Sequence, residues 1–203
     1  MKYKPLNRKE LELLIRNEKI SLGDIDVSNI IDMSRLFQNF FERDDYTGLE
    51  TWDVSNVIDM SYMFAGFDYD EFDISGWNTC NVKNMAGLFC NNLCFNQDIS
   101  KWNVSKVEDM SYMFSAALDF NSDISMWNVS SVTNMQGMFL YADSFNQDIS
   151  KWNVSNVINM NYMFDNAKSF NQNINSWNIS KVETMKDMFM DSPLKNNPPL
   201  WYK

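Results

Sequence analysis

The chain of 203 residues contains no histidine and only three cysteines. Histidine is the commonest general base and a common metal ligand, so its absence removes the usual catalytic triad and most zinc sites. Cys80, Cys90 and Cys94 are odd in number and form no CxxC pair, which argues against a disulfide framework. Because Lys83 is the one cation close to them in sequence, we expect buried thiols rather than a catalytic nucleophile.

Positive charge and long apolar runs are also scarce. Lys and Arg number 17 against 27 Asp and Glu, a formal net charge of −10, and the sequence shows no basic patch. We therefore expect no nucleic-acid partner and no binding to an anionic membrane surface. No segment approaches the ~20 apolar residues of a membrane-spanning helix, so we expect no membrane insertion. The first residues lack the apolar run of a secretory signal and any lipidation motif, which favours a cytoplasmic location.

The sequence is, by contrast, rich in repetition. Residues 145–164 read FNQDISKWNVSNVINMNYMF and residues 95–114 read FNQDISKWNVSKVEDMSYMF, with 16 of 20 positions identical. Methionine and phenylalanine recur at a fixed period, and a degenerate first unit begins at Ile25. Tryptophan recurs every 25 residues, at Trp52, Trp77, Trp102, Trp127, Trp152 and Trp177. A fixed period of this length is typical of a solenoid.

Each unit is expected to form one coil of that solenoid. From Val107 onward, apolar residues at positions 107, 110, 113, 114 and 117 predict a short helix, with Ser105 as its N-cap. The preceding stretch DISKW suits a short strand with Ile99 directed inward. The prediction is an α/β repeat solenoid of about seven 25-residue coils, each a short strand plus a short helix. Since one coil cannot bury its own apolar face, neighbouring coils supply half of the core.

The two ends of the array differ from the repeats and are predicted to be caps. Residues 5–19 pattern as an amphipathic helix with Leu11, Leu14 and Ile15 directed inward. Prolines near the other end prevent a further regular coil, and Trp201 can cover the last tryptophan layer. The predicted domains are an N-terminal helical cap at 1–23, the repeat solenoid at 24–190 and a C-terminal cap at 191–203. Such caps prevent growth by association, so we expect a monomer.

The motif FNQDISKWNVSNVxxMxxMF at a 25-residue period resembles the bacterial BspA-like repeat family. That family is related to leucine-rich repeats and is often labelled a surface protein or lipoprotein. The resemblance covers about residues 24–190, and eight or more positions recur in every unit. It implies a leucine-rich-repeat-like solenoid and a role in interaction or adhesion, and it brings no catalytic residues. It also implies display at the cell surface, although the sequence shows no signal peptide or lipobox.

Acidic and amide side chains form rows at the same period. One hypothesis for the aspartates is a run of calcium sites, since hard cations take oxygen ligands. We favour the alternative that each carboxylate accepts a hydrogen bond from a backbone turn of the next coil, because no glycine-rich calcium loop is present. The asparagine rows are expected to stack their amides rather than to carry glycans. The rows are Asp73, Asp98, Asp123 and Asp148; Asn96, Asn121, Asn146 and Asn171; and Asn78, Asn103, Asn128, Asn153 and Asn178.

The aromatic and methionine rows are expected to form the core rather than a carbohydrate platform or a set of metal ligands. The tyrosine row leaves two interpretations open. Tyr62, Tyr112 and Tyr162 alternate with Gly87 and Gly137, two residues before each phenylalanine. They either face outward about 10 Å apart as an interface, or pack over the neighbouring glycine and seal the seam between coils.

No enzyme motif is present: the sequence has no phosphate-binding loop and no nucleophile elbow. We expect no enzyme, no catalytic residue, no cofactor and no bound metal. The predicted function is a non-enzymatic protein–protein interaction module whose protein partner is unidentified. The alternatives are a surface-displayed adhesin that binds host or matrix ligands, and a calcium-binding solenoid.

Residues that differ from coil to coil are the candidates for partner contact, because the constant positions are needed for folding. The slot before each tryptophan holds Lys101, Met126 and Lys151 in consecutive units, and a methionine among lysines indicates a contact. The candidate partner-binding surface is Tyr62, Tyr112, Tyr162, Lys101, Met126 and Lys151.

Overall fold

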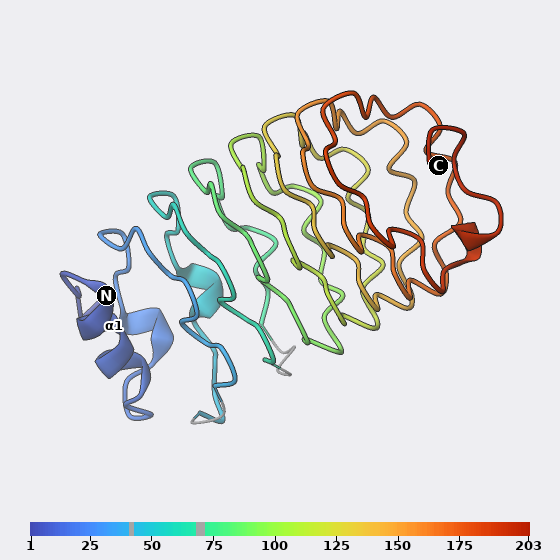
Figure 1. The fold of residues 1–203 in the computed structure, drawn as a ribbon. Helices are drawn as coiled ribbons and strands as arrows, with labels where there is room; N and C mark the ends of the chain where they lie inside the picture. Colours follow the sequence, from blue (N-terminus) through green and yellow to red (C-terminus); the bar gives the residue numbers. More distant parts are fainter. Residues whose placement is uncertain (41–42, 68–71) are drawn as a thin grey trace.

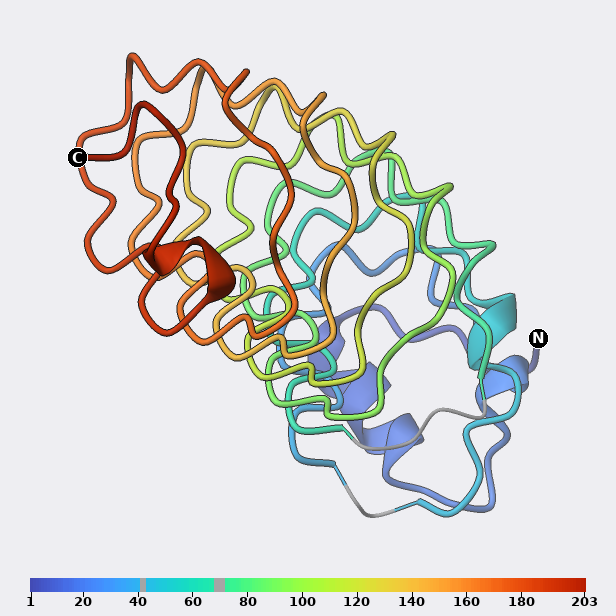
Figure 2. The same cartoon turned by 90° about the vertical axis from the view of Figure 1, so that its right-hand side faces the viewer.

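The protein is a repeat solenoid. The computed structural model describes residues 1–40, 43–67 and 72–203. The chain winds through successive coils that stack side by side from the N-terminus to the C-terminus (Figure 1). The view turned by 90° shows the same succession, with each coil offset from the one before it (Figure 2). The predicted repeat architecture is confirmed.

Regular secondary structure is sparse. Within the described residues, the helices are limited to α1 and three short 3-10 helices, and strand pairing is limited to isolated parallel bridges. The helices are α1 (Arg8–Ile15), η1 (Leu22–Asp24), η2 (Leu49–Thr51) and η3 (Pro193–Lys195). None of these helices has the length and apolar character needed to cross a membrane. Within the array, the bridges link Asp32, Asp59, Asn84, Asp109, Asn134, Asn159 and Thr184, each to the next.

The short helix predicted from Val107 onward is wrong. Tyr112 has a φ of +56° and Ala116 a φ of +55°, which a right-handed helix does not allow. The segment is a run of turns instead, in which the Met113 amide donates to the carbonyl of Met110 at 3.2 Å. Consecutive turns that each close over three residues place apolar side chains on one side at nearly the spacing of a helix. A helix and a run of turns therefore give nearly the same spacing of apolar residues in the sequence.

The left-handed residues direct alternate peptide groups along the axis of the stack. The amide of Tyr112 donates to the carbonyl of Gln136 at 2.7 Å, and that of Phe114 to the carbonyl of Met138 at 2.9 Å. The same bonds recur between the other coils. Hydrogen bonds between coils therefore replace the bonds that a helix makes within itself.

The strand predicted at DISKW is also wrong. Ile99 begins a turn there, closed by the Trp102 amide on the Ile99 carbonyl at 3.1 Å. The strand-like pairing lies further along each coil, where the amide of Glu108 donates to the carbonyl of Lys83 at 2.8 Å. The extended part of the coil is thus a few residues long and follows the tryptophan.

The aromatic and methionine rows form the core, as predicted. Trp102 is 3 % exposed, and Met110 and Phe114 are 0 % exposed. Phenylalanine rings stack from coil to coil, with the Phe114 and Phe139 centroids 5.7 Å apart and the rings tilted by 8°. A continuous aromatic column therefore runs through the described array.

The N-terminal helix is shorter than the predicted 5–19 segment. Asn7 caps it, since its side chain accepts a hydrogen bond from the amide of Glu10 at 3.1 Å. Leu11 and Ile15 are buried as predicted, and Leu14 is half-buried. At the end of α1, the buried guanidinium of Arg43 donates to the carbonyl of Ile15 at 2.8 Å and joins the helix to the array.

The C-terminal segment folds back against the last coil. Trp201 stacks on Trp177 with ring centroids 6.3 Å apart, and its indole Nε1 donates to the carbonyl of Ile174 at 3.0 Å. The last tryptophan layer is therefore covered, as the sequence predicts.

Candidate recognition surface

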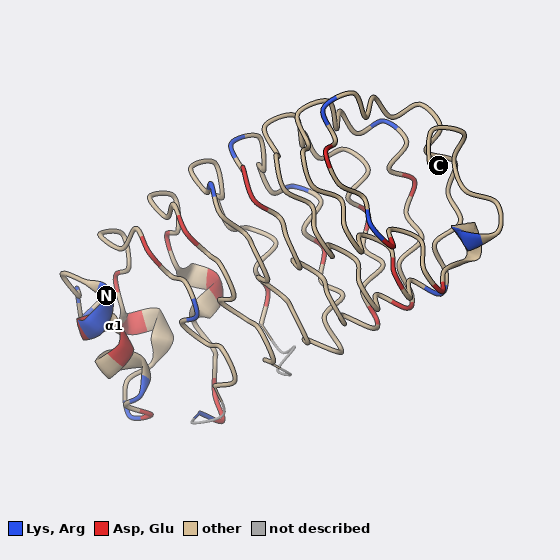
Figure 3. Ribbon diagram, viewed as in Figure 1, with Lys and Arg blue, Asp and Glu red and all other residues tan. Residues whose placement is uncertain are grey.

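Three rows of side chains on the coils bear on recognition. The first is the tryptophan-turn row, formed by the residue before each tryptophan. Lys101, Met126 and Lys151 occupy it in consecutive coils, and all three are exposed. Met126 is 78 % exposed, far more than the methionines of the core. Basic and acidic positions are interspersed along the stack as a whole (Figure 3).

The second row holds the tyrosines, which lie against the glycine of the next coil. A Cβ atom on Gly87 would come within 2.3 Å of Cε1 of Tyr62, and one on Gly137 within 2.5 Å of Cε1 of Tyr112. The Tyr112 hydroxyl also accepts a hydrogen bond from Nε2 of Gln136 at 2.6 Å. This geometry favours the seam-sealing interpretation over an outward-facing interface.

Tyr162 differs because the next coil offers Asp187 in place of glycine. The Nζ atom of Lys186 lies 6.0 Å from the centroid of the Tyr162 ring, a cation–π arrangement. All three tyrosines are half-buried and belong to the run of turns, whereas Lys101 and Met126 belong to the tryptophan turn. The six candidate residues therefore form two rows within the coil rather than one surface.

The third row was missed by the sequence reasoning. It is the ladder row, one residue per coil beside the parallel bridges: Ile31, Ile58, Lys83, Glu108, Thr133, Ile158 and Glu183. Ile31 is 57 % exposed, Ile58 43 % and Ile158 40 %. A shallow groove of about 470 Å³ runs beside Ile31 and Ile58 and reaches Lys83. The signal in the sequence is a slot that varies among isoleucine, threonine and charged residues beside constant core positions.

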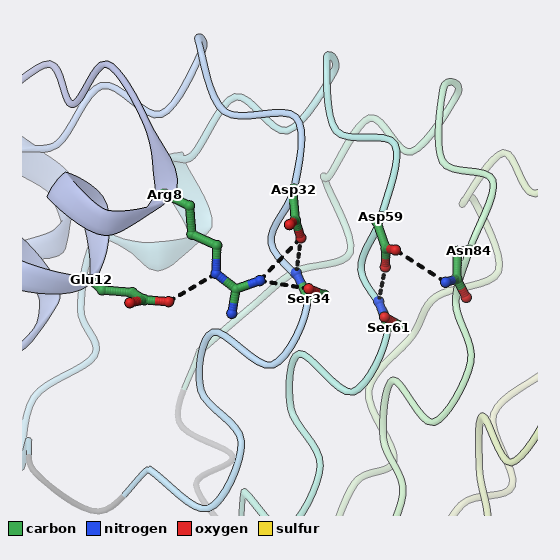
Figure 4. Close-up of polar contacts among 7 residues, drawn as sticks. All are labelled: Arg8, Glu12, Asp32, Ser34, Asp59, Ser61 and Asn84. Atoms are coloured by element: carbon green, nitrogen blue, oxygen red, sulfur yellow. Dashed lines mark hydrogen bonds and ion pairs between the residues drawn. The ribbon is translucent and has the colours of Figure 1, made fainter.

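An acidic and amide row follows the ladder row and meets α1 at the N-terminal end (Figure 4). Arg8 donates to the Glu12 carboxylate at 2.8 Å, to Asp32 at 3.2 Å and to the Ser34 hydroxyl at 2.6 Å. Burial raises the pKa of Asp32, but the hydrogen bonds from Ser34 and Arg8 outweigh it, so this pKa lies below its ordinary value. The charge at this end is thus compensated within the chain.

The next coils continue the row without a cation. Asp59 accepts from the amide of Ser61 at 2.7 Å and from Nδ2 of Asn84 at 3.1 Å (Figure 4). Where an aspartate is followed by an asparagine in the next coil, as at Asp59 and Asp109, one carboxylate oxygen finds a donor in its own coil and the other in the next. These side chains serve the stack and do not form an open ligand site.

The aspartate row also bonds within the turns. Asp98 and Asp123 each accept a hydrogen bond from the amide of the serine two residues later, at 2.9 Å. The expected bond to the next coil is therefore wrong, because the partner lies in the same coil. These bonds lower the pKa of both carboxyl groups. The part of the chain that the structure describes holds no group of three or more Cys, Asp or Glu residues able to hold a metal ion.

The two asparagine rows behave differently from one another. Asn96 accepts at Oδ1 from the amide of Asn121 at 2.9 Å, so the first row does join neighbouring coils. Asn103 accepts from the amide of Ser105 at 3.1 Å, so the second row closes turns within a coil. The predicted stacking of amides on each other is replaced by side-chain-to-backbone bonds.

The cysteines are less buried than expected. Cys94 is exposed, which contradicts the expected burial, and Cys80 and Cys90 are half-buried. Burial raises the pKa of the Cys90 thiol, although a hydrogen bond with Ser115 opposes it. A raised pKa disfavours the thiolate that a nucleophile needs.

Comparison with known proteins identifies the repeat. One family model matches residues 12–123 and, separately, residues 94–201, and its description is Mycoplasma protein of unknown function, DUF285. The chain belongs to the DUF285 family. The two matches overlap, which agrees with a unit that recurs in register along the array. No curated protein and no solved structure matches this DUF285 protein.

Proposed function

We propose that this DUF285 protein is a non-enzymatic protein-recognition module that binds a protein partner through the surface of its solenoid. The observation that carries the proposal is Met126, 78 % exposed between Lys101 and Lys151 in the neighbouring coils. Methionine is enriched at protein interfaces and contributes little to stability when solvated. The residues of this row are exposed and differ from coil to coil, whereas the constant apolar positions of the repeat form the core. Such variable surface positions give a solenoid its specificity for a partner.

The ladder row supports the same proposal from a second place on the coil. Ile31 and Ile58 stand side by side on adjacent coils and border the shallow groove. Adjacent exposed isoleucines give a partner apolar area to cover, while Lys83 and Glu108, 3.2 Å apart as an ion pair, provide a polar rim.

The BspA-like resemblance concerns where the partner is found. It favours an adhesin displayed at the cell surface, with a host or matrix protein as partner. Protease shaving of intact source cells, followed with an antibody to this protein, separates that location from a cytosolic one. Loss of signal from unbroken cells directs the search to extracellular ligands, and survival until lysis directs it to the cytosol.

The proposal is tested by quantitative cross-linked capture from the compartment so identified. The bait is the full chain, compared with Met126→Glu and with Leu13→Glu as a matched control, since Leu13 is also strongly exposed, at 64 %, and lies in α1 rather than in the tryptophan-turn row. We expect one protein to be recovered by the wild type and the control and to fall about tenfold with Met126→Glu, as for a central contact. Recovery that does not change between Met126→Glu and the wild type would contradict a contact at this row.

A further inference from the structure

The first asparagine row stops one step short of the C-terminal segment. At each inner step an asparagine accepts two donors from the next coil, one a backbone amide and the other a side chain. Asn121 accepts at Oδ1 from the amide of Asn146 at 2.9 Å, and its main-chain carbonyl accepts from Nε2 of Gln147 at 2.6 Å. One coil earlier, the side-chain donor is the hydroxyl of Ser122, which donates to the main-chain carbonyl of Asn96 at 2.9 Å. The acceptor pair therefore takes an amide N–H together with a hydroxyl or carboxamide donor.

Asn171 is the last member of that row, and its acceptor pair is left open. Its own amide donates to Oδ1 of Asn146 at 3.1 Å. In the described chain, no donor reaches the Asn171 side-chain oxygen or carbonyl oxygen. The amide at the equivalent position, that of Asn196, 25 residues after Asn171, is engaged elsewhere, because it donates to the carbonyl of Leu194 at the end of η3.

A cleft occupies the position of the missing donors. It lies between the last coil and the C-terminal segment, which folds back at the red end of the chain (Figure 1). The cleft measures about 250 Å³ and has no charged side chain in its lining. Its polar lining consists of amide side chains from Asn171, Gln172, Asn173, Asn175 and Asn197, and proline and leucine side chains supply the apolar part.

The size and chemistry of the cleft define the ligand. Sites for drug-sized molecules measure roughly 300–1,000 Å³, so this cleft fits a single ring rather than a peptide strand. A neutral, amide-rich lining selects a neutral ligand with several hydroxyl groups. An N-acetylated amino sugar carries an amide N–H beside a hydroxyl on one ring, which is the donor pair that each inner asparagine receives.

We propose that this cleft binds the acetamido group and adjacent hydroxyl of an N-acetylated amino sugar, with Asn171 as the acceptor. The proposal is independent of the protein-recognition function, because neither the candidate residues Lys101, Met126 and Lys151 nor the ladder row lines the cleft.

The test is a ¹H–¹⁵N NMR titration of the full 203-residue chain with N-acetylglucosamine. We expect saturable shifts confined to Asn171, Gln172, Asn173, Asn175 and Asn197 and their chain neighbours. 2-Deoxyglucose, which has only hydrogen at C2 in place of the acetamido group, is expected to shift these resonances at least tenfold more weakly, because one donor of the pair is missing.

The matched variants are Asn171→Ala and Asn128→Ala. Asn128 is also exposed but lies in the second asparagine row, away from the cleft. Asn171→Ala is expected to weaken binding about tenfold, as loss of one hydrogen bond does, whereas Asn128→Ala leaves it unchanged. The dispersed spectrum of each variant verifies that it is folded. Equal binding of 2-deoxyglucose, shifts elsewhere on the surface, or full binding by Asn171→Ala would each overturn the proposal.

Discussion

The indole Nε1 of Trp102 donates a hydrogen bond to the main-chain carbonyl of Ile74, 28 residues earlier, at 3.0 Å. The same bond recurs along the array, as far as Trp201 and the carbonyl of Ile174. Tryptophan therefore does two things that leucine cannot do. It fills the core of its own coil, and it fixes the register of that coil on the preceding one.

Replacement of Trp127 by phenylalanine tests this register bond. Trp127 donates to the Ile99 carbonyl at 3.1 Å, and that carbonyl keeps a second donor in the Trp102 amide. We expect the free energy of unfolding to fall by about 1–2 kcal/mol, from one lost hydrogen bond and a smaller ring. Urea unfolding followed by circular dichroism measures the change. Trp201→Phe is the control and should cost less because Trp201 is only partly buried, so an equal loss at both positions would contradict a role for the inner bond.

Alanine at Gly137 tests the packing of tyrosine over glycine. Gly137 has a φ of +57°, and its added Cβ would lie 2.5 Å from the Tyr112 ring. We expect a loss of about 1–3 kcal/mol in unfolding free energy from overpacking and left-handed strain. Gly76→Ala is the matched control, because nothing lies within 4 Å of the point that its Cβ would occupy, and it should change stability by less than about 0.5 kcal/mol. Tyr112→Ala should recover part of the Gly137→Ala loss, and a fully additive double variant would argue against this contact.

The core was predictable because the apolar residues that recur at the same position of each 25-residue unit are the buried ones. The six regular units from Trp52 to Trp177 have their tryptophan and phenylalanine at one position, and only a buried position needs that regularity. Trp102 and Phe114 could therefore be assigned to the core without knowing the path of the backbone between them.

The backbone path was not predictable from the same pattern. Helix and consecutive turns place Met110, Met113 and Ala117 on one side alike, and the choice between them depends on bonds to the next coil. Tyr112 adopts a positive φ because its amide reaches Gln136, a residue 24 positions away. The spacing of apolar residues shows only the local periodicity. It does not show which backbone groups will bond to the next coil.

The candidate site was predictable only in part. Variation before tryptophan correctly located Met126 at an exposed position. The ladder row was missed, because isoleucines such as Ile31 and Ile58 are expected in the core. Only the parallel bridges beside them show that their side chains face outward.

Glycine at Ala116 is expected to stabilise the protein. Ala116 has a φ of +55°, a conformation that costs an L-residue about 1–2 kcal/mol and glycine nothing. After the entropy that glycine loses on folding, the net gain in unfolding free energy is about 0.5 kcal/mol. Urea unfolding measures it, with Ala117→Gly as the control. Ala117 is buried and has no positive φ, so its replacement should destabilise; stabilisation by both would point to a general effect of glycine.

Acid is expected to weaken the array through the aspartate row. Hydrogen bonds from the following serine hold the pKa of Asp98, Asp123 and Asp148 below the ordinary value of 3.8. A carboxyl group with a lowered pKa in the folded state contributes stability above its unfolded pKa, and this contribution is lost as the pH falls through the folded pKa. The midpoint of thermal unfolding should therefore fall between about pH 5 and about pH 2.

The triple variant Asp98→Asn, Asp123→Asn, Asp148→Asn isolates that contribution. Asparagine keeps the oxygen that accepts the turn bond and removes the titration, so the fall with acid should be shallower than in the wild type. Parallel pH profiles for the two proteins would show that other carboxyl groups govern the acid response.

Calcium is expected to leave the stability of the chain unchanged. Asp123 already accepts the Ser125 amide at 2.9 Å, and each coil offers one such carboxylate, whereas calcium takes six to eight oxygen ligands. The thermal midpoint in millimolar calcium should stay within about 1 °C of its value in chelator, since a ligand stabilises only the state it binds. Magnesium at the same concentration controls for ionic strength. A rise of several degrees that calcium produces, magnesium does not and Asp123→Asn abolishes would establish the calcium-binding alternative, because no screening effect depends on one carboxylate.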